Sequence, residues 1–281
     1  MPELPEVETV VRRLRSVLPG KEVSAIKVYK QKSFMGDIYE LIGTRITQVN
    51  RKAKLIHIEL KSGKNVLVHL KMTGQLIYVD ESVRLGGGHP TADWLQALPS
   101  THTRVSITFS DGSNLYFNDQ RIFGWIRLLS PSELENEFAR YAPDVIEESI
   151  SDEYFWDRVQ RTSRAIKVVI LDSKIMSGLG NIYACDALNI AQISPYRKAN
   201  TLSKSEADRL LDASKAVLQK GIELGGATIE HFRHIDGFSG NYQKEVAVYG
   251  REGEPCLNCG GTIIKEKIAG RGTYFCPNCQ I

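Results

Sequence analysis

The sequence has no run of apolar residues near the roughly 18 that a membrane-spanning helix needs, so we do not expect an integral membrane protein. Its first ten residues contain three glutamates and neither lysine nor arginine, which does not fit a secretory signal peptide. Cysteine is scarce, with five in 281 residues, and without a secretory signal these are not expected to form a disulfide framework. We therefore expect a cytoplasmic protein with no membrane partner.

The length of 281 residues, or 31.5 kDa, suits roughly two domains. Hydrophobic residues make up 42% and charged residues 25%, which is near the average for globular proteins. This composition excludes a disordered tail, a collagen-like fibre and a long coiled coil. The sequence contains neither an internal repeat nor a low-complexity tract.

The small net charge of +3 hides an uneven distribution of charge. Residues 21–71 contain eleven basic and four acidic residues, whereas residues 131–153 contain eight acidic residues and one arginine. Clustered cations gain affinity for a polyanion by displacing counterions from its phosphates. A charge run is more often only a solvated face, so the pattern by itself merely favours a nucleic-acid partner.

The N-terminal part of the sequence predicts one helix followed by many strands. Pro5 can occupy a first helical turn, Glu6 suits the positive end of the helix dipole, and apolar residues recur at helical spacing over residues 7–14. Five β-rich runs follow, and Ser-Gly and Asp-Gly turns separate some of them: 55–60, 65–70, 75–79, 104–109 and 114–117. This pattern predicts a β-sandwich or barrel that ends near Ser130.

The acidic residues 131–153 are expected to form a linker, in part helical. Beyond them the pattern becomes helical over residues 165–171, 182–190 and 203–218. Ser203 and Glu206 have the spacing of a capping box at the start of the last of these helices.

Four of the five cysteines form two Cys-x-x-Cys pairs, Cys256 with Cys259 and Cys276 with Cys279, separated by 16 residues. Each pair can direct two thiolates at one ion, and the spacing strongly favours a tetrahedral zinc site over two redox motifs. Four protein ligands leave no open position, so one structural Zn2+ per chain is expected. About 35 residues bury too little apolar surface to fold alone, so the metal should supply folding free energy.

The segment between the two cysteine pairs is expected to form a β-hairpin with its tip at residues 269–272. Arg271 at this tip has a guanidinium that suits phosphate oxygens, although an ordinary surface arginine is an equal alternative from the local sequence. The fifth cysteine, Cys185, is expected to be a small buried residue.

Motifs at both ends and in the middle of the chain resemble those of the formamidopyrimidine-DNA glycosylases, bacterial enzymes that remove oxidised purines such as 8-oxoguanine. They are Met1-Pro2-Glu3-Leu4-Pro5-Glu6-Val7-Glu8-Thr9, Arg51-Lys52-Ala53-Lys54, His69-Leu70-Lys71-Met72, Asp119-Gln120-Arg121-Ile122-Phe123-Gly124, Gly180-Asn181-Ile182-Tyr183-Ala184, Val248-Tyr249-Gly250-Arg251 and the four cysteines. The resemblance covers essentially the whole chain.

The resemblance implies an α+β fold in four parts. These are an N-terminal catalytic β-sandwich with an N-terminal helix (1–130), a linker (131–150), a helix-two-turn-helix DNA-binding domain (151–240) and a four-cysteine zinc finger (246–281). It also implies a bifunctional DNA glycosylase and AP lyase that acts on damaged double-stranded DNA. Such an enzyme is expected to be a monomer associated with the bacterial nucleoid.

The same resemblance assigns catalytic roles. Pro2 would be the Schiff-base nucleophile once Met1 is removed, since its nitrogen is otherwise an unreactive amide. Glu3 would be the proton donor beside it, Lys54 would assist β-elimination, and Arg271 would belong to the catalytic set through its contact with the DNA backbone. From local sequence alone, Lys54 would be one more cation of the basic region.

The remaining matches are to DNA-contacting positions. Those that contact the DNA backbone are His69, His102, Lys167, Asn181, Tyr249 and Arg271. Met72, Arg121 and Phe123 match the trio that fills the gap left by an extruded base, which a glycosylase needs because extrusion costs stacking and pairing. Without the family context, Met and Phe at strand ends are more often core residues, and Asn181 is more often an ordinary N-cap.

Three positions depart from the family pattern. Ile122 occupies a place where many relatives have a second basic residue, Arg104 one where a second histidine is common, and residues 141–144 match the usual Leu-Gly-Pro-Glu only loosely. None of these changes a catalytic residue or a zinc ligand, so they bear on substrate preference.

Two alternatives remain from the sequence. An endonuclease VIII-like enzyme would have the same chemistry but a pyrimidine pocket, and the loop at residues 236–242 would discriminate between the two. A zinc-containing DNA-binding protein without catalysis would be expected if Pro2 or Glu3 were absent or Met1 were retained.

Overall fold

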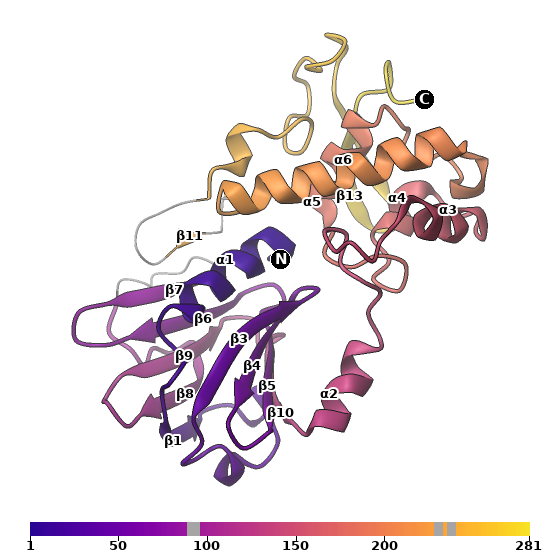
Figure 1. Cartoon of the computed structure of the whole chain (residues 1–281). Coiled ribbons are helices and arrows are strands. Elements are labelled where there is room, and N and C mark those ends of the chain that lie inside the picture. The colour runs from indigo at the N-terminus through magenta and orange to yellow at the C-terminus, as the bar shows by residue number, and fades with distance from the viewer. Residues whose placement is uncertain (89–95, 228–232, 235–239) are drawn as a thin grey trace. The chain divides into compact units, whose positions relative to one another are not determined.

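The computed structural model describes residues 1–88, 96–227, 233–234 and 240–281. The chain divides into two compact units, one formed by Met1–Ala139 with Leu224–Gln243 and the other by Arg140–Glu223 with Lys244–Ile281. The first contains two β-sheets and the second is mainly helical (Figure 1), which confirms the α+β class. The finer division at residues 130, 150 and 240 stays a prediction.

The N-terminal unit is a β-sandwich. One sheet has the order β1-β8-β9-β6-β7-β11 and the other the order β2-β10-β5-β4-β3. Their strands are β1 (Val23–Val28), β2 (Phe34–Met35), β3 (Ile46–Lys52), β4 (Leu55–Leu60), β5 (Asn65–His69), β6 (Gly74–Val79), β7 (Arg84–Gly88), β8 (Thr103–Phe109), β9 (Asn114–Asp119), β10 (Trp125–Leu129) and β11 (Arg233–His234). A single buried cluster combines side chains from both sheets and from α1, which defines the core.

Helix α1 (Leu4–Arg15) forms where the sequence predicts it. Glu3 and Glu6 form a capping box at its N-terminus, Pro5 lies in its first turn, and basic residues complement the dipole at its C-terminus. The helix lies against β7 and β3 (Figure 1), and its apolar side chains join the core cluster. This packing holds the first residues of the chain against the edge of the sandwich core.

All five predicted strands are present in the structure, with differences of at most two residues at their ends. The predicted turns after Ser62 and Asp111 are also present, with Gly63 and Gly112 at positive φ. The predicted acidic linker begins with α2 (Pro131–Phe138). Ser130 and Glu133 form a capping box at the N-terminus of this helix. The linker is therefore helical in part, as expected.

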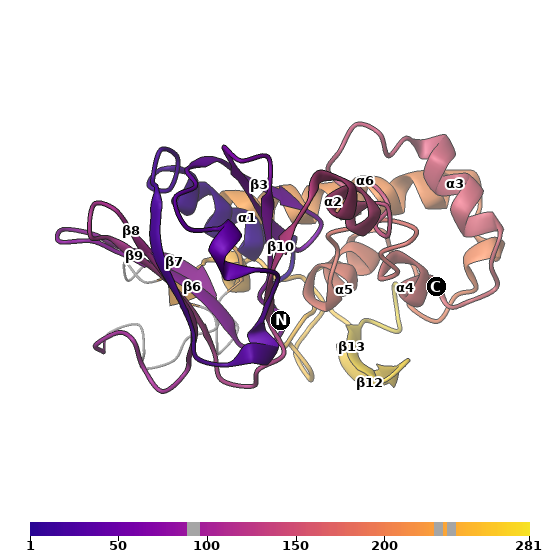
Figure 2. The same ribbon diagram turned by 90° about the horizontal axis from the view of Figure 1, so that it is seen from below.

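The second unit consists of α3 (Asp152–Gln160), α4 (Ile166–Ile170), α5 (Asn181–Ile190), α6 (Lys204–Glu223) and the hairpin β12 (Ile264–Ile268) and β13 (Arg271–Phe275). Helix α5 packs against α6, α4 and β13 (Figure 2). Helix α6 runs one turn further than predicted, and Ser203 and Glu206 exchange the expected capping hydrogen bonds. Short 3-10 turns occur at Gln31–Ser33, Ile38–Glu40, Ala199–Thr201 and Tyr242–Lys244.

Within the part of the chain that the structure describes, no helix combines the length and the apolar character that crossing a bilayer requires.

Candidate functional site

The N-terminal segment lies buried at the start of α1. Pro2 is buried, and Glu3 is only 4% exposed at the N-cap. The backbone N–H of Glu3 donates to Glu6 Oε2 at 2.8 Å, and Glu6 Oε1 accepts from the backbone N–H of Ala227 at 2.8 Å. The Glu6 carboxylate therefore connects the first turn of α1 to the segment after α6. The sequence pattern explained Glu6 only as a helix-dipole residue, because a contact over 221 residues has no local signature.

A second group of predicted residues forms a basic cluster on the sandwich. Lys54 follows Ala53, which has φ +53°, in the turn between β3 and β4. His69 ends β5, and its pKa is lowered to about 3 by burial and by the charges of Lys71, Lys54 and Arg127. Burial and Arg127 also lower the pKa of Lys71. These cations lie close enough to change one another's pKa values. Together they make the edge of the sandwich with Lys54, His69 and Lys71 attractive to an anion.

His69 is held in one tautomer by its neighbours. Its Nδ1 accepts a hydrogen bond from the backbone N–H of Lys71 at 3.1 Å, so a neutral ring has its proton on Nε2. The ring also contacts the edge of Trp125, with 5.8 Å between centroids. His69 can thus offer Nε2–H as a neutral donor.

We expect the imidazole signals of His69 to stay constant in NMR spectra between pH 5 and pH 8. The folded pKa of about 3 lies below the ordinary value of 6.5, so the unfolded state binds the proton first. The contribution of His69 to the free energy of unfolding should therefore fall as pH drops from about 6.5 to about 3, by at most about 1.4 kcal/mol per pH unit. His69→Gln identifies the signals and should remove this contribution. A titration of His69 with a midpoint near 6.5 would contradict the expectation.

The predicted wedge residues are exposed, unlike ordinary core residues of their type. Met72 is 39% and Phe123 47% exposed, and Arg121 is exposed beside them. The Arg121 guanidinium carbon lies 4.7 Å from the centroid of the Phe123 ring, a cation–π contact. Met72 belongs to the loop between β5 and β6, and the other two belong to the loop between β9 and β10. This arrangement suits side chains that enter a partner.

In the second unit, two predicted residues converge on the backbone of the β12–β13 hairpin. Asn181 Nδ2 donates to the carbonyl of Gly272 at 2.9 Å. Lys167 Nζ donates to Thr273 Oγ1 at 2.6 Å and to the same carbonyl at 3.5 Å. Lys167 is only 1% exposed, so in this structure its ammonium bonds to the buried side of the hairpin. Its assignment to the DNA backbone stays a prediction.

Two local expectations in this region need correction. The N-cap of α5 is Gly180, and Asn181 is the first helical residue, because the Asn181 side chain bonds to the hairpin instead of capping its own helix. The hairpin tip is a two-residue turn of Ala269 and Gly270 with φ of +47° and +80°, and Arg271 already pairs with Ile268 at the start of β13. Arg271 is exposed next to this turn, beside a cavity of about 240 Å³ that Arg164 and Lys167 also line.

His102 and Tyr249 lie in separate units. His102 is half-buried before β8, and its carbonyl accepts from the backbone N–H of Asp119 at 2.9 Å. The Tyr249 ring lies 4.8 Å from that of Tyr274, and buried Asp186 accepts from the Tyr249 backbone N–H at 3.2 Å. Asp186 thereby fixes the segment that enters the cysteine region.

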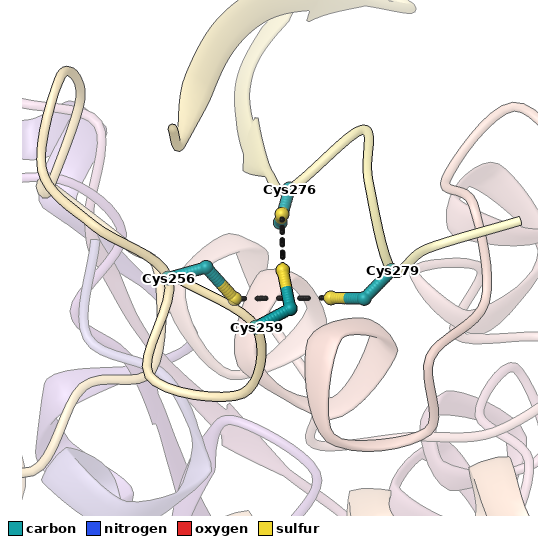
Figure 3. Close-up of side chains that lie close together, drawn as sticks. All are labelled: Cys256, Cys259, Cys276 and Cys279. Carbon is teal, nitrogen blue, oxygen red and sulfur yellow. Dashed lines mark hydrogen bonds between the residues drawn. The ribbon is translucent and has the colours of Figure 1, made fainter. Parts of the chain in front are cut away.

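The four predicted metal ligands come together in one cluster (Figure 3). The Sγ atoms of Cys256 and Cys279 are 3.7 Å apart, those of Cys259 and Cys276 are 3.5 Å apart, and all four lie within 4.8 Å of one another. A zinc ion with bonds of about 2.3 Å gives tetrahedral S–S edges of about 3.8 Å, so the donor set fits such an ion. The cluster is that of a structural metal site.

Buried amides join this cluster to α5. Gln280 Oε1 accepts from the Cys276 backbone N–H at 2.8 Å and from Asn189 Nδ2 at 3.0 Å, and Gln280 Nε2 donates to the Ile193 carbonyl. Cys185 is buried, as expected, in a small apolar cluster with Val248, Ile263 and the ligands Cys256 and Cys276. Its pKa is raised to about 11, mainly by burial, which makes it a poor nucleophile.

Comparison with known proteins gives a consistent result along the chain. Three family models match: the formamidopyrimidine-DNA glycosylase N-terminal domain at residues 1–126, its H2TH domain at residues 141–233, and a zinc finger found in FPG and IleRS at residues 253–281. Proteins named formamidopyrimidine-DNA glycosylase from Pelotomaculum thermopropionicum and Neisseria meningitidis are 39% and 37% identical. The matches cover 100% of this chain and 99% and 100% of those relatives.

Solved structures give the same family. Lactococcus lactis Fpg in complex with DNA containing an abasic site has a TM-score of 0.87 and 31% identity, with 100% of both chains covered. The complex of that protein with DNA containing Fapy-dG has a TM-score of 0.86 and 31% identity, with 99% of both chains covered. With full-length relatives, all three domain models and the four-cysteine cluster in agreement, the chain belongs to the formamidopyrimidine-DNA glycosylase family.

Proposed function

We propose that this protein is a bifunctional DNA glycosylase and AP lyase that excises oxidised purines, 8-oxoguanine and formamidopyrimidines, from double-stranded DNA. The observation that carries the proposal is the full-length similarity to proteins named for this activity. The Lactococcus lactis relatives in complex with Fapy-dG and abasic-site DNA support damaged DNA as the partner. We expect it to act as a monomer on the bacterial nucleoid.

The proposed reaction begins at Pro2. Removal of Met1 would turn its amide into a secondary amine, and an α-amino group has a pKa of about 8 against about 10.4 for lysine. A useful fraction is therefore unprotonated at neutral pH and can attack the sugar C1′. The bond from C1′ to the damaged base breaks, and Glu3 delivers protons as the deoxyribose ring opens. Burial of Pro2 and Glu3 at the start of α1 supports this assignment, because the helix fixes their positions.

The same intermediate explains the lyase activity. A secondary amine gives an iminium that stays positively charged, so it can accept electrons in successive eliminations of the 3′ and 5′ phosphates. We assign Lys54 to assist the first elimination. The nearby charges of Lys71 and Arg127 and the neutral donor of His69 support a role for this edge in holding the anionic backbone.

Met72, Arg121 and Phe123 would fill the duplex after the base leaves the stack. Their exposure supports this role, since an inserted apolar side chain and a donor to the orphaned base offset the lost stacking and pairing.

Phe123→Ala should slow base excision more than it weakens binding to undamaged duplex. The wedge acts only after encounter, so we expect single-turnover excision from an 8-oxoguanine duplex to slow by at least about tenfold. The dissociation constant for undamaged DNA, measured by fluorescence anisotropy, should change less than about twofold. Excision at the wild-type rate in this variant would show that Phe123 is not a wedge.

Arg271→Ala should weaken binding to damaged and undamaged duplexes alike. A lost phosphate contact removes sequence-independent affinity, and the slope of log K against log salt should decrease by about 0.9. The measurement is anisotropy between 50 and 200 mM KCl, a range of roughly fourfold in salt. Lys265→Ala on the neighbouring strand is the matched control. An unchanged slope for Arg271→Ala would remove the residue from the phosphate contacts.

We further propose that the metal in the four-cysteine cluster is zinc. Thiolate ligands with tetrahedral spacing suit zinc, and four protein ligands leave no position for a substrate. Cys256, Cys259, Cys276 and Cys279 would hold the ion and thereby fix the hairpin that presents Arg271.

The function is tested by comparing cleavage of duplexes that contain 8-oxoguanine, a formamidopyrimidine or an oxidised pyrimidine. We expect the two purine lesions to be cut fastest. Preference for the pyrimidine would instead favour the endonuclease VIII-like alternative, and binding without any cleavage would favour a non-catalytic DNA-binding protein. The loop at residues 236–242, which the sequence suggested as discriminator, lies largely outside the described residues.

A further inference from the structure

The loops that carry Met72, Arg121 and Phe123 adjoin two neighbouring strands of one sheet. Strands β6 and β9 pair in antiparallel fashion, with Gly74 opposite Asp119. Met72 comes two residues before Gly74, and Arg121 comes two residues after Asp119. The strand pairing therefore brings the loop with Met72 next to the loop with Arg121 and Phe123.

The carboxylate of Asp119 joins these two loops. Its side chain is 0% exposed. Oδ1 accepts from the hydroxyl of Thr73 and from the backbone N–H of Arg121 at 3.2 Å, and Oδ2 accepts from the backbone N–H of Gly124 at 2.6 Å. Thr73 Oγ1 in turn accepts from the Arg121 N–H at 3.0 Å. One carboxylate thus contacts the Met72 loop and both ends of the loop with Arg121 and Phe123.

Both loops hold conformations that need such support. Lys71, next to Met72, has φ +50°, and Ile122, between Arg121 and Phe123, has φ +56°. A left-handed backbone is unusual for a residue with a β-branched side chain and persists where surrounding contacts fix it. At Gly124 an added Cβ would lie 2.8 Å from Phe117 Cζ and 2.9 Å from the His69 carbonyl, so this end of the loop is closely packed.

We propose that Asp119 is a positioning residue for base extrusion, which holds Met72, Arg121 and Phe123 in one rigid arrangement so that they enter the duplex together. The inference rests on the proposed glycosylase function. A carboxylate suits the task because both oxygens accept, whereas an amide of the same shape would direct an N–H at one of the three donors. Asp119 acts through the loops and touches neither the base nor the sugar.

The test is a double-mutant cycle of Asp119→Asn with Phe123→Ala, measured by single-turnover excision from an 8-oxoguanine duplex. In the wild-type background we expect Asp119→Asn to slow excision by at least about tenfold. In the Phe123→Ala background its further effect should be below about threefold, since the three side chains enter as one unit and that unit has already lost its ring. Fluorescence of 2-aminopurine beside the lesion should report slower unstacking in Asp119→Asn. Strand cleavage at a preformed abasic site, which needs no base release, should keep most of its rate.

Asp111→Asn is the matched control, because it makes the same chemical change in the exposed turn at the other end of β9 and should leave excision unchanged. Effects of Asp119→Asn that multiply with those of Phe123→Ala, or excision at the wild-type rate, would overturn the inference. Absence of excision by the wild type would instead refute the proposed function itself.

A second pair of variants decides the matter if Asp119→Asn does not fold. Thr73→Val keeps the carboxylate and removes only the hydroxyl that reaches it from the Met72 loop, and Thr73→Ser restores that hydroxyl. Slow excision in Thr73→Val with recovery in Thr73→Ser supports the inference. Equal rates in Thr73→Val and wild type refute it.

Discussion

Borohydride should trap this protein covalently on lesion-containing DNA through the nitrogen of Pro2, and protein that retains Met1 should give no adduct. In the initiator-containing chain that nitrogen is part of a peptide bond, so it has no nucleophilic lone pair. After removal of Met1, which a small residue such as proline at the second position permits, it becomes a secondary amine. Reduction of the iminium to a stable amine then fixes the protein on the sugar.

The experiment compares mature protein, a fusion that keeps Met1, and Pro2→Gly on the same 8-oxoguanine duplex. Pro2→Gly leaves a primary amine without the proline ring and should weaken the trap, while retention of Met1 should abolish it. Pro5→Ala is the matched control, since Pro5 lies in the first turn of the same helix and is explained by helix geometry alone. Mass spectrometry of the digested adduct identifies the modified residue. An adduct at the wild-type rate in Met1-retaining protein would place the nucleophile elsewhere, with Lys54 the first candidate.

The structure adds a reason why Pro2, the proposed nucleophile, is well placed. Glu3 caps α1, and the carboxylate of Glu6 accepts the Glu3 N–H while also holding Ala227. The residue next to Pro2 is therefore fixed by two elements that are far apart in sequence. A catalytic amine on a frayed terminus would spend most of its time away from the sugar, and orientation of this kind contributes strongly to rate.

Local features of the fold were predictable from the sequence because their causes are local. Helix α1 follows from Pro5 and the apolar spacing, and the cysteine cluster follows from two Cys-x-x-Cys pairs. Strand β7 was not predicted, since Arg84–Gly88 contains three glycines and glycine is depleted in strands. It pairs with β6, and a Cβ on Gly86 would lie 1.9 Å from the Leu76 carbonyl oxygen, so the close approach of the two strands needs glycine there.

The candidate site shows the same division between local and long-range causes. The exposed Met72 and Phe123 were predicted only through family resemblance, because exposure of an apolar side chain at a strand end depends on what lies above it. The roles of Asp119 and Glu6 were missed, since each depends on one long-range hydrogen bond, from Thr73 to Asp119 over 46 positions and from Ala227 to Glu6 over 221. Lys167 shows the converse: the resemblance assigned it to the DNA backbone, and in this structure the fold buries it against the hairpin.

Replacing any one of Cys256, Cys259, Cys276 and Cys279 by serine should abolish DNA binding, with a loss of at least about a hundredfold, while the β-sandwich stays folded. The hairpin between the two pairs contains only ten residues in strands, and the small apolar cluster beside it also draws on Cys185 and Val248, which lie outside the hairpin. It cannot bury enough surface to persist without the metal. The hydrogen bonds from Asn181 and Lys167 to the Gly272 carbonyl would then be lost, and with them the placement of Arg271.

Metal analysis should find one zinc per wild-type chain and none in the cysteine variants, and anisotropy measures their affinity for duplex DNA. Cys185→Ser is the matched control, because Cys185 is buried beside the cluster but belongs to α5 and is not among its four ligands. Near-ultraviolet circular dichroism should show that the tertiary packing of the sandwich survives, because its core cluster includes no residue of the finger. Wild-type protein free of zinc, or a quadruple variant with full DNA affinity, would disprove the role of the metal. If the four variants of the metal ligands lose DNA binding and Cys185→Ser keeps it, the zinc ion acts on DNA affinity through the geometry of one hairpin.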